Sequence, residues 1–271
     1  MDILDTIIAN KRKEVKSQKE AVPIKALIDL HVGQFERPVC GMREALANSS
    51  SGIIAEFKRR SPSKGWIFPD AKVAEVAPAY ETGGAAACSV LTDLDFFGGS
   101  LDDLKQSRKL VSIPLLRKDF MIDEYQIYQA RTTGADAILL IASVLAPDDC
   151  LRLAQKAREL NMDVLLEIHK EEELKCLNPY IDMLGVNNRN LGTFDTSVNN
   201  SFRLLEQIKK EIGDGDNAPL LVSESGISDV QTIRELRNAG FRGFLIGEMF
   251  MKTTNPGKTL SDLIRQLHLQ I

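Results

Sequence analysis

The sequence predicts an α/β fold, a (β/α)8 TIM barrel with an N-terminal helical extension, on three observations. From Ile53 onward, short apolar runs alternate with amphipathic stretches, as in successive β/α units. Most of these runs are continuously apolar, which is typical of parallel strands buried on both faces. Eight such units fit into 271 residues, and barrels of this class have about 250 residues. An open doubly wound sheet is the alternative, but no G-x-G-x-x-G follows the first strand.

The elements are expected in the following order. Apolar residues at helical spacing between Ile3 and Val15 predict a first amphipathic helix, followed by helices at 24–30 and 41–47. Strands are expected at 53–58, 86–91, 114–118, 137–141, 163–167, 182–187, 220–224 and 243–246. The helices between them are marked by Pro and Asp at their starts and Gly at their ends; they include 71–82, 124–133, 150–160, 170–177, 197–210, 228–239 and 257–269. We expect 1–271 to be a single barrel domain, with the 1–50 helical extension packing on the barrel mouth.

Composition excludes several classes of protein. A net charge of −4 argues against binding nucleic acid through phosphate neutralisation. The four cysteines are widely spaced, so we expect neither a disulfide framework nor a metal site. The sequence shows no signal-peptide pattern and no apolar run long enough to span a membrane. We therefore expect a cytoplasmic protein without membrane partners, as a monomer or weak homodimer.

Ionisable residues recur where the predicted strands end. Glu56 and Lys58 lie two apart at the end of the first strand, so their side chains face the same side. Lys118 ends the third strand, Glu167 the fifth and Glu224 the seventh. In a closed barrel the carboxyl ends of the strands share one mouth, where the active sites of such enzymes lie. This pattern favours a catalytic mouth over scattered surface charges.

The last two loops favour phosphate binding. Ser225 and Gly226 open a helix after the seventh strand, and Gly247 and Glu248 follow the eighth. Loops after these strands commonly bind phosphate through backbone N–H groups, which glycine lets the anion approach closely. Ser61 and the basic segment from Lys58 to Lys64 follow the first strand, which neighbours the eighth in a closed barrel.

Several segments together closely resemble the indole-3-glycerol-phosphate synthase family of tryptophan biosynthesis. They are IIAEFKRRSPSKG, SVLTDLDFFGGS, LLRKDFMIDEYQ, ADAILLIASVL, LLEIH, GVNNRNL, SESGIS and LIGEMFM, and the similarity covers essentially all of 50–252. The resemblance implies a lyase that closes the pyrrole ring of 1-(2-carboxyphenylamino)-1-deoxyribulose 5-phosphate, with loss of carbon dioxide and water. It implies no cofactor. Asn190 and the Met249-Phe250 pair depart from the commoner family pattern.

Residue chemistry is consistent with that reaction. We expect Lys118 to be the acid that polarises the ketone, oriented by Glu56. Glu167 and Lys58 are the candidates for the dehydration step, and the sequence leaves open which donates and which accepts the proton.

The remaining site residues are expected to bind the substrate. Asn187 is assigned to a sugar hydroxyl, and Ser225 to the substrate or its polar surroundings. Arg189 is assigned either to the substrate carboxylate or to Glu224. Glu248 is expected to offer its backbone N–H, with its carboxylate turned away from the phosphate. An apolar slot for the aromatic ring is assigned to Phe97, Phe120, Leu139 and Leu191.

Two other functions stay open at this point. Another phosphosugar barrel enzyme, such as an aldolase, would use Lys118 as a Schiff-base lysine. A regulator that only binds a phosphorylated metabolite would not need so many juxtaposed acids and bases. Structural roles are expected for Asp119, which would hold neighbouring charges, and for His169.

Overall fold

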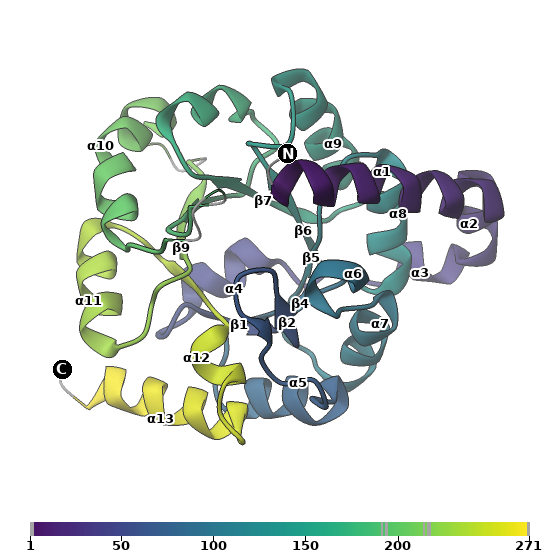
Figure 1. Cartoon of the computed structure of the whole chain (residues 1–271). Coiled ribbons are helices and arrows are strands. Elements are labelled where there is room, and N and C mark those ends of the chain that lie inside the picture. Colours follow the sequence, from purple (N-terminus) through teal and green to yellow (C-terminus); the bar gives the residue numbers. More distant parts are fainter. Residues whose placement is uncertain (1–2, 191, 193–194, 214, 216–217, 270–271) are drawn as a thin grey trace.

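Eight parallel strands close into a barrel surrounded by helices, as the sequence predicts (Figure 1). The computed structural model describes residues 3–190, 192, 195–213, 215 and 218–269. The strands follow the order β1-β10-β9-β8-β7-β6-β5-β4 around the barrel, so the first strand pairs with the last. Their bounds are β1 (Ile53–Phe57), β4 (Ala87–Leu91), β5 (Leu115–Lys118), β6 (Ala137–Ile141), β7 (Asp163–Ile168), β8 (Met183–Asn187), β9 (Leu220–Glu224) and β10 (Gly243–Ile246).

Some of the outer helices begin or end on the capping residues that the sequence suggests. The Asp123 side chain and Gln126 form a capping box at the start of α8, which ends on Gly134 with φ of 100°. The helices are α5 (Val73–Thr82), α7 (Leu101–Leu110), α8 (Glu124–Thr133), α9 (Pro147–Glu159), α10 (Asn199–Ile212), α11 (Val230–Ala239) and α13 (Pro256–His268).

Smaller elements differ from expectation. The segment expected as a helix at 170–177 is a 3-10 helix, η1 (Glu171–Cys176). Two short helices, α6 (Leu94–Phe97) and α12 (Glu248–Met251), lie in loops at the mouth. A small antiparallel hairpin, β2 (Arg60–Ser61) with β3 (Gly65–Trp66), folds the basic loop after β1 back on itself.

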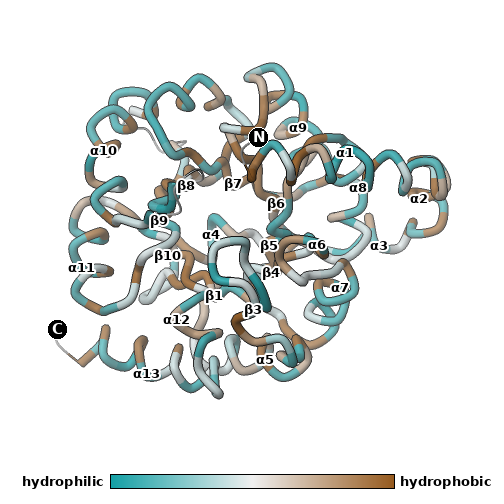
Figure 2. The backbone as a smooth tube through the Cα atoms, in the orientation of Figure 1, coloured by the Kyte–Doolittle hydropathy of each residue, from teal (hydrophilic) through white to brown (hydrophobic). Residues whose placement is uncertain are grey.

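Strand side chains alternate between two hydrophobic clusters. In β1, Ile53, Ala55 and Phe57 pack against the outer helices, whereas Ile54 packs inside the barrel with Leu116 and Leu165. Because side chains two apart share a face, Glu56, Lys118 and Glu167 lie on the inward face, one layer above these apolar residues. Hydrophobic residues accordingly follow the strands, while the loop that carries β2 is hydrophilic (Figure 2).

The N-terminal segment reaches both ends of the barrel. It consists of α1 (Ile3–Ala21), α2 (Ile24–Leu30), α3 (Val32–Glu36) and α4 (Met42–Asn48). Met42 and Leu46 of α4 are fully buried in the inner cluster, and Arg43 N–H donates to Asp163, the first residue of β7. Helix α4 therefore closes the amino-terminal end of the barrel, and α1 lies at the opposite end (Figure 1). Among the described helices, none is both long and apolar enough to span a bilayer.

Candidate active site

A cavity of about 550 Å³ opens at the carboxyl ends of the strands, within the size range of small-molecule sites. Most residues predicted for the site line it. These are Glu56, Lys58, Ser61, Phe97, Lys118, Phe120, Leu139, Glu167, Asn187, Arg189, Ser225, Gly226, Gly247 and Glu248. Glu224 lies beside them, in contact with Lys118. Leu191 lies outside the described residues.

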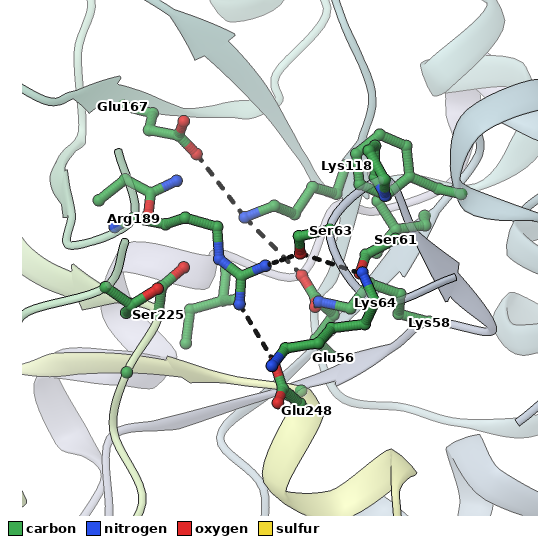
Figure 3. Close-up of a pocket in the computed structure, with 18 of the residues that line it drawn as sticks. Glu56, Lys58, Ser61, Ser63, Lys64, Lys118, Glu167, Arg189, Ser225 and Glu248 are labelled. Atoms are coloured by element: carbon green, nitrogen blue, oxygen red, sulfur yellow. Dashed lines mark hydrogen bonds and ion pairs between the residues drawn. The ribbon is translucent and has the colours of Figure 1, made fainter. Parts of the chain in front are cut away.

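The centre of the cavity is the ammonium group of Lys118 (Figure 3). Its Nζ lies 2.7 Å from Glu224 Oε2, 3.7 Å from Glu167 Oε2 and 3.8 Å from Glu56 Oε2. Burial disfavours the charged amine, but the three carboxylates outweigh burial and raise the pKa of Lys118 above its ordinary value. Lys118 is therefore charged, and three carboxylates fix its ammonium group at the cavity surface.

Glu56 binds both lysines of the site. One carboxylate oxygen accepts a hydrogen bond from Lys58, and the other faces Lys118. Burial opposes ionisation of Glu56, yet the two ammonium groups hold its pKa below the ordinary value. A Cβ on Gly247 would lie 2.4 Å from Glu56 Oε1, so glycine there leaves room for this carboxylate. That requirement is separate from the predicted approach of the backbone to a phosphate.

The position of the Glu224 carboxylate also depends on a glycine that leaves room for it. A Cβ on Gly185, in the neighbouring strand β8, would lie 2.3 Å from Glu224 Oε1. Glycine at 185 thus allows this carboxylate to lie under Lys118. Burial raises the pKa of Glu224, Lys118 lowers it and nearby Glu167 raises it, with a net value of about 7.

Arg189 crosses the cavity to the loops that follow β1 and β10. Its guanidinium donates to Ser63 Oγ and, at 3.1 Å, to Glu248 Oε2 (Figure 3). Arg189 therefore does not pair with Glu224, one of its two expected partners; Lys118 binds Glu224 at Oε2 instead. This arginine holds the Glu248 carboxylate at the edge of the cavity. Asn187 Oδ1 accepts from the Arg189 backbone N–H at 3.0 Å.

One wall of the cavity is apolar. The rings of Phe97 and Phe120 pack with centroids 6.0 Å apart, and Leu139 of β6 lies in the same cavity. Ile3 and Ile7 of α1 complete this wall. The surface suits a planar aromatic group.

The loop after β9 has an unusual backbone. Ser225 and Gly226 have φ of 68° and 76°, in the left-handed region that non-glycine residues rarely adopt. A Cβ at Gly226 would also lie 2.7 Å from Thr196 Cγ2. This close packing fixes the loop at the cavity edge. In the part of the chain that the structure describes, no group of three or more His, Cys, Asp or Glu side chains is arranged to hold a metal ion.

Comparison with known proteins agrees with this geometry. A family profile described as "Indole-3-glycerol phosphate synthase" matches residues 4–263. The chain is 56% identical over 267 residues to "Indole-3-glycerol phosphate synthase" of Bacteroides thetaiotaomicron, covering 98% of this chain and 99% of that protein.

The chain belongs to the indole-3-glycerol phosphate synthase family.

A second relative, the synthase of Neisseria meningitidis serogroup B, is 44% identical over 265 residues, covering 93% of this chain and 95% of that protein. The structure of the tryptophan synthase A-subunit from Pyrococcus furiosus matches with a TM-score of 0.58 at 14% identity, covering 81% of this chain and 98% of that one. That likeness shows the barrel fold alone. The family resemblance and the barrel predicted from the sequence are both confirmed.

Membership of the synthase family also confirms the predicted reaction. It is the carboxy-lyase step of tryptophan biosynthesis, in which 1-(2-carboxyphenylamino)-1-deoxyribulose 5-phosphate is converted into indole-3-glycerol phosphate. The substrate carries a carboxylate, an aromatic ring, sugar hydroxyls and a phosphate. Each of these groups can meet a cationic, apolar or polar part of the cavity.

Sequence reasoning missed several residues of this synthase site. Ile3, Leu4 and Ile7 line the cavity, but their helical spacing indicates only that one face of α1 is buried. Ser63, which accepts from Arg189, lies inside the basic segment after β1 and was not singled out. Lys252, after α12, is a further cation of the lining. As expected, Asp119 holds neighbouring charges, because its carboxylate contacts Arg117 and Lys11.

Proposed function

We propose that Lys118, Lys58 and Glu167 carry the proton transfers of indole-3-glycerol phosphate synthesis in this protein. The observation that supports this most strongly is the ammonium of Lys118, held by three carboxylates at the surface of the cavity. A group fixed in this way can meet a reacting oxygen without first reorganising.

Ring closure is assigned to Lys118. The ring carbon that bears the carboxylate attacks the ketone carbon, and the ketone oxygen takes a proton from the Lys118 ammonium as the bond forms. Carbon dioxide then leaves from the same ring carbon, and its bonding electrons restore the aromatic ring. The apolar wall of Phe97 and Phe120 solvates a carboxylate poorly, which favours this loss.

Dehydration is assigned to the remaining pair. The Lys58 ammonium, held by Glu56, protonates the departing hydroxyl, and the Glu167 carboxylate removes the proton from the adjacent carbon. The new double bond completes the pyrrole ring. Lys58 directly follows β1 and Glu167 belongs to β7, and these strands lie on different sides of the barrel. One substrate between them therefore meets a donor on one side and an acceptor on the other.

Substrate binding is assigned to the cavity walls. The phosphate would lie against the loops of Gly226 and Gly247 and near the basic segment that follows β1. Arg189 would pair with the substrate carboxylate, and Asn187 with a sugar hydroxyl. Ser225 and Ser61 lie close enough to the cavity to add polar contacts.

The test combines turnover with binding. Purified protein mixed with the anilino-ribulose phosphate should produce indole fluorescence. Lys118→Met should lower kcat about 10²- to 10⁴-fold while substrate affinity stays within a few fold, because general acid catalysis is lost and the binding walls remain. Lys105→Met, an exposed lysine on α7, is the matched control. Wild-type kcat in a folded Lys118→Met protein would remove Lys118 from this role.

We also propose that the enzyme acts in the cytoplasm as a monomer or weak homodimer. The large exposed apolar residues, such as Leu30, Leu94 and Leu269, belong to separate elements, which is normal for a surface without a permanent partner. Light scattering over a range of protein concentrations tests the oligomeric state. A concentration-independent dimer or larger assembly would contradict it.

A further inference from the structure

One buried ionisable group beside the cavity has no part in the reaction as assigned above. The chain has three histidines, and His169 is the one next to Glu167. Its Nε2 lies 3.3 Å from Glu167 Oε1, and its Nδ1 lies 3.6 Å from Glu173 Oε2. The imidazole therefore stands between two carboxylates.

The fold holds this residue firmly. Strand β7 ends at Ile168, and His169 follows Glu167 by two residues, so both side chains extend to the same side. The 3-10 helix η1 returns Glu173 to this point, where its Oε2 accepts the His169 backbone N–H at 2.7 Å. The His169 carbonyl accepts from Asn200 Nδ2 at 3.1 Å, which ties the segment to α10.

The contacts of the ring favour its charged form. A neutral imidazole has one N–H and one lone pair, so one of its nitrogens would present a lone pair to a carboxylate oxygen. Only the imidazolium directs an N–H toward both Glu167 and Glu173. Neither nitrogen, both buried, has a hydrogen bond of regular geometry to the described residues, so these two carboxylates are its polar neighbours.

The surrounding charges act in the same direction. Burial lowers the pKa of His169, but Glu173, Glu167 and Glu224 outweigh burial and raise it above the ordinary value. Cations also lie near: Lys118 contacts Glu167 from the cavity side, and Lys170, Arg189 and Arg203 line the polar cavity that His169 shares. The pKa of His169 is raised with these cations in place.

We propose that His169 is a positioning residue for Glu167, acting as an imidazolium clamp that Glu173 braces. The inference rests on the role of Glu167 proposed above. His169 contacts Oε1 of Glu167, whereas Oε2 faces Lys118 and the cavity. His169 thus fixes one oxygen of Glu167, while the other oxygen faces the cavity where the substrate would bind. His169 is absent from the lining of the cavity that holds Lys118, so it acts through Glu167 without touching the substrate.

Kinetics test the clamp. His169→Gln keeps a polar side chain that cannot become cationic, and it should lower kcat about 10- to 100-fold with KM little changed, because the carboxylate loses its fixed position. Glu173→Gln should lower kcat by less, because His169 itself still contacts Glu167. His268→Gln, on the exposed end of α13, is the matched control.

Magnetic resonance gives a readout that does not depend on turnover. With three histidines, the imidazole signals can be assigned from His169→Gln and followed between about pH 5 and 8. The His169 signal should titrate above the ordinary pKa of a histidine, and at lower pH in Glu173→Gln. A ring that stays neutral throughout would overturn the clamp.

The kinetic outcomes separate the two proposals. Wild-type kcat in Glu167→Gln would refute the proposed role of Glu167 as the base in dehydration. An inactive Glu167→Gln together with a wild-type kcat in His169→Gln would refute only the clamp.

Discussion

Replacing Lys11 by methionine should release the N-terminal helix from the barrel. Lys11 Nζ lies 2.9 Å from Asp93 Oδ2, 3.0 Å from Asp119 Oδ1 and 2.7 Å from Glu14 Oε2. Lys11 is 0% exposed, and Asp93 and Asp119 are 1% and 2% exposed. Burial disfavours the charged amine, but the carboxylates raise the pKa of Lys11 above its ordinary value. The ammonium therefore joins α1 to the loops after β4 and β5.

The loss of folding stability follows from the two buried aspartates that remain without Lys11. Methionine fills a similar volume but leaves two buried aspartates without this cation, and breaking a buried ion pair costs about 3–5 kcal/mol. With an unfolding entropy of about 2.1 cal/mol/K per residue, that corresponds to a fall in melting temperature of roughly 5 to 9 °C for 271 residues. Because Ile3 and Ile7 of α1 line the cavity, KM should rise more than kcat falls.

Chemical and thermal denaturation measure the loss of stability, and steady-state kinetics measures the change in KM. Lys16→Met is the matched control, because that side chain on the same helix is 77% exposed. Lys11→Met combined with Asp93→Asn should recover about 0.5–3 kcal/mol. Asparagine removes the unpaired charge, and its oxygen can still cap α6 at the Phe96 N–H, as Asp93 does. Wild-type stability in Lys11→Met, or no recovery in the double variant, would refute the reasoning.

Two further perturbations test the packing of the barrel. Gly185→Ala should displace Glu224 from Lys118 and lower kcat about 10-fold or more, measured by indole fluorescence; Gly33→Ala, where a Cβ meets nothing within 4 Å, is the control. Burial and nearby Asp163 raise the pKa of Asp182 to about 6 in the folded state. The folded state therefore binds the Asp182 proton more tightly than the unfolded state does, and the protein loses stability as pH rises from about 4 to 6. Asp182→Asn should therefore raise the unfolding free energy by about 1–2 kcal/mol at pH 7 and by little at pH 4; equal gains at both values would contradict this.

Local patterns were sufficient for most of the barrel. Each strand of the barrel lies within about one residue of its predicted range, because continuous apolar runs bounded by caps are a local property of the chain. The resemblance of the motifs at the strand ends to one family was also visible in the sequence alone. Elements shaped by their surroundings were missed, such as the β2–β3 hairpin and the tightening of η1 into a 3-10 helix.

The candidate site divides in the same way. That Glu56, Lys118 and Glu167 share one mouth follows from strand alternation, because a period of two sends alternate side chains inward. Which partner each one has does not follow from it. Arg189 pairs with Glu248, and His169 lies between Glu167 and Glu173, through contacts that strand spacing cannot specify.

The sequence by itself therefore determined the barrel fold and the reaction, and it located the candidate site at the carboxyl ends of the strands. Only the tertiary structure decided that α1 supplies part of the cavity wall, that Lys11 holds this helix in place, and that glycines at 185 and 247 leave room for two carboxylates. The physical reason is the range of the interactions. Hydrophobic periodicity acts between neighbouring residues, whereas charge pairing and close packing depend on distances that exist only once the strands have closed.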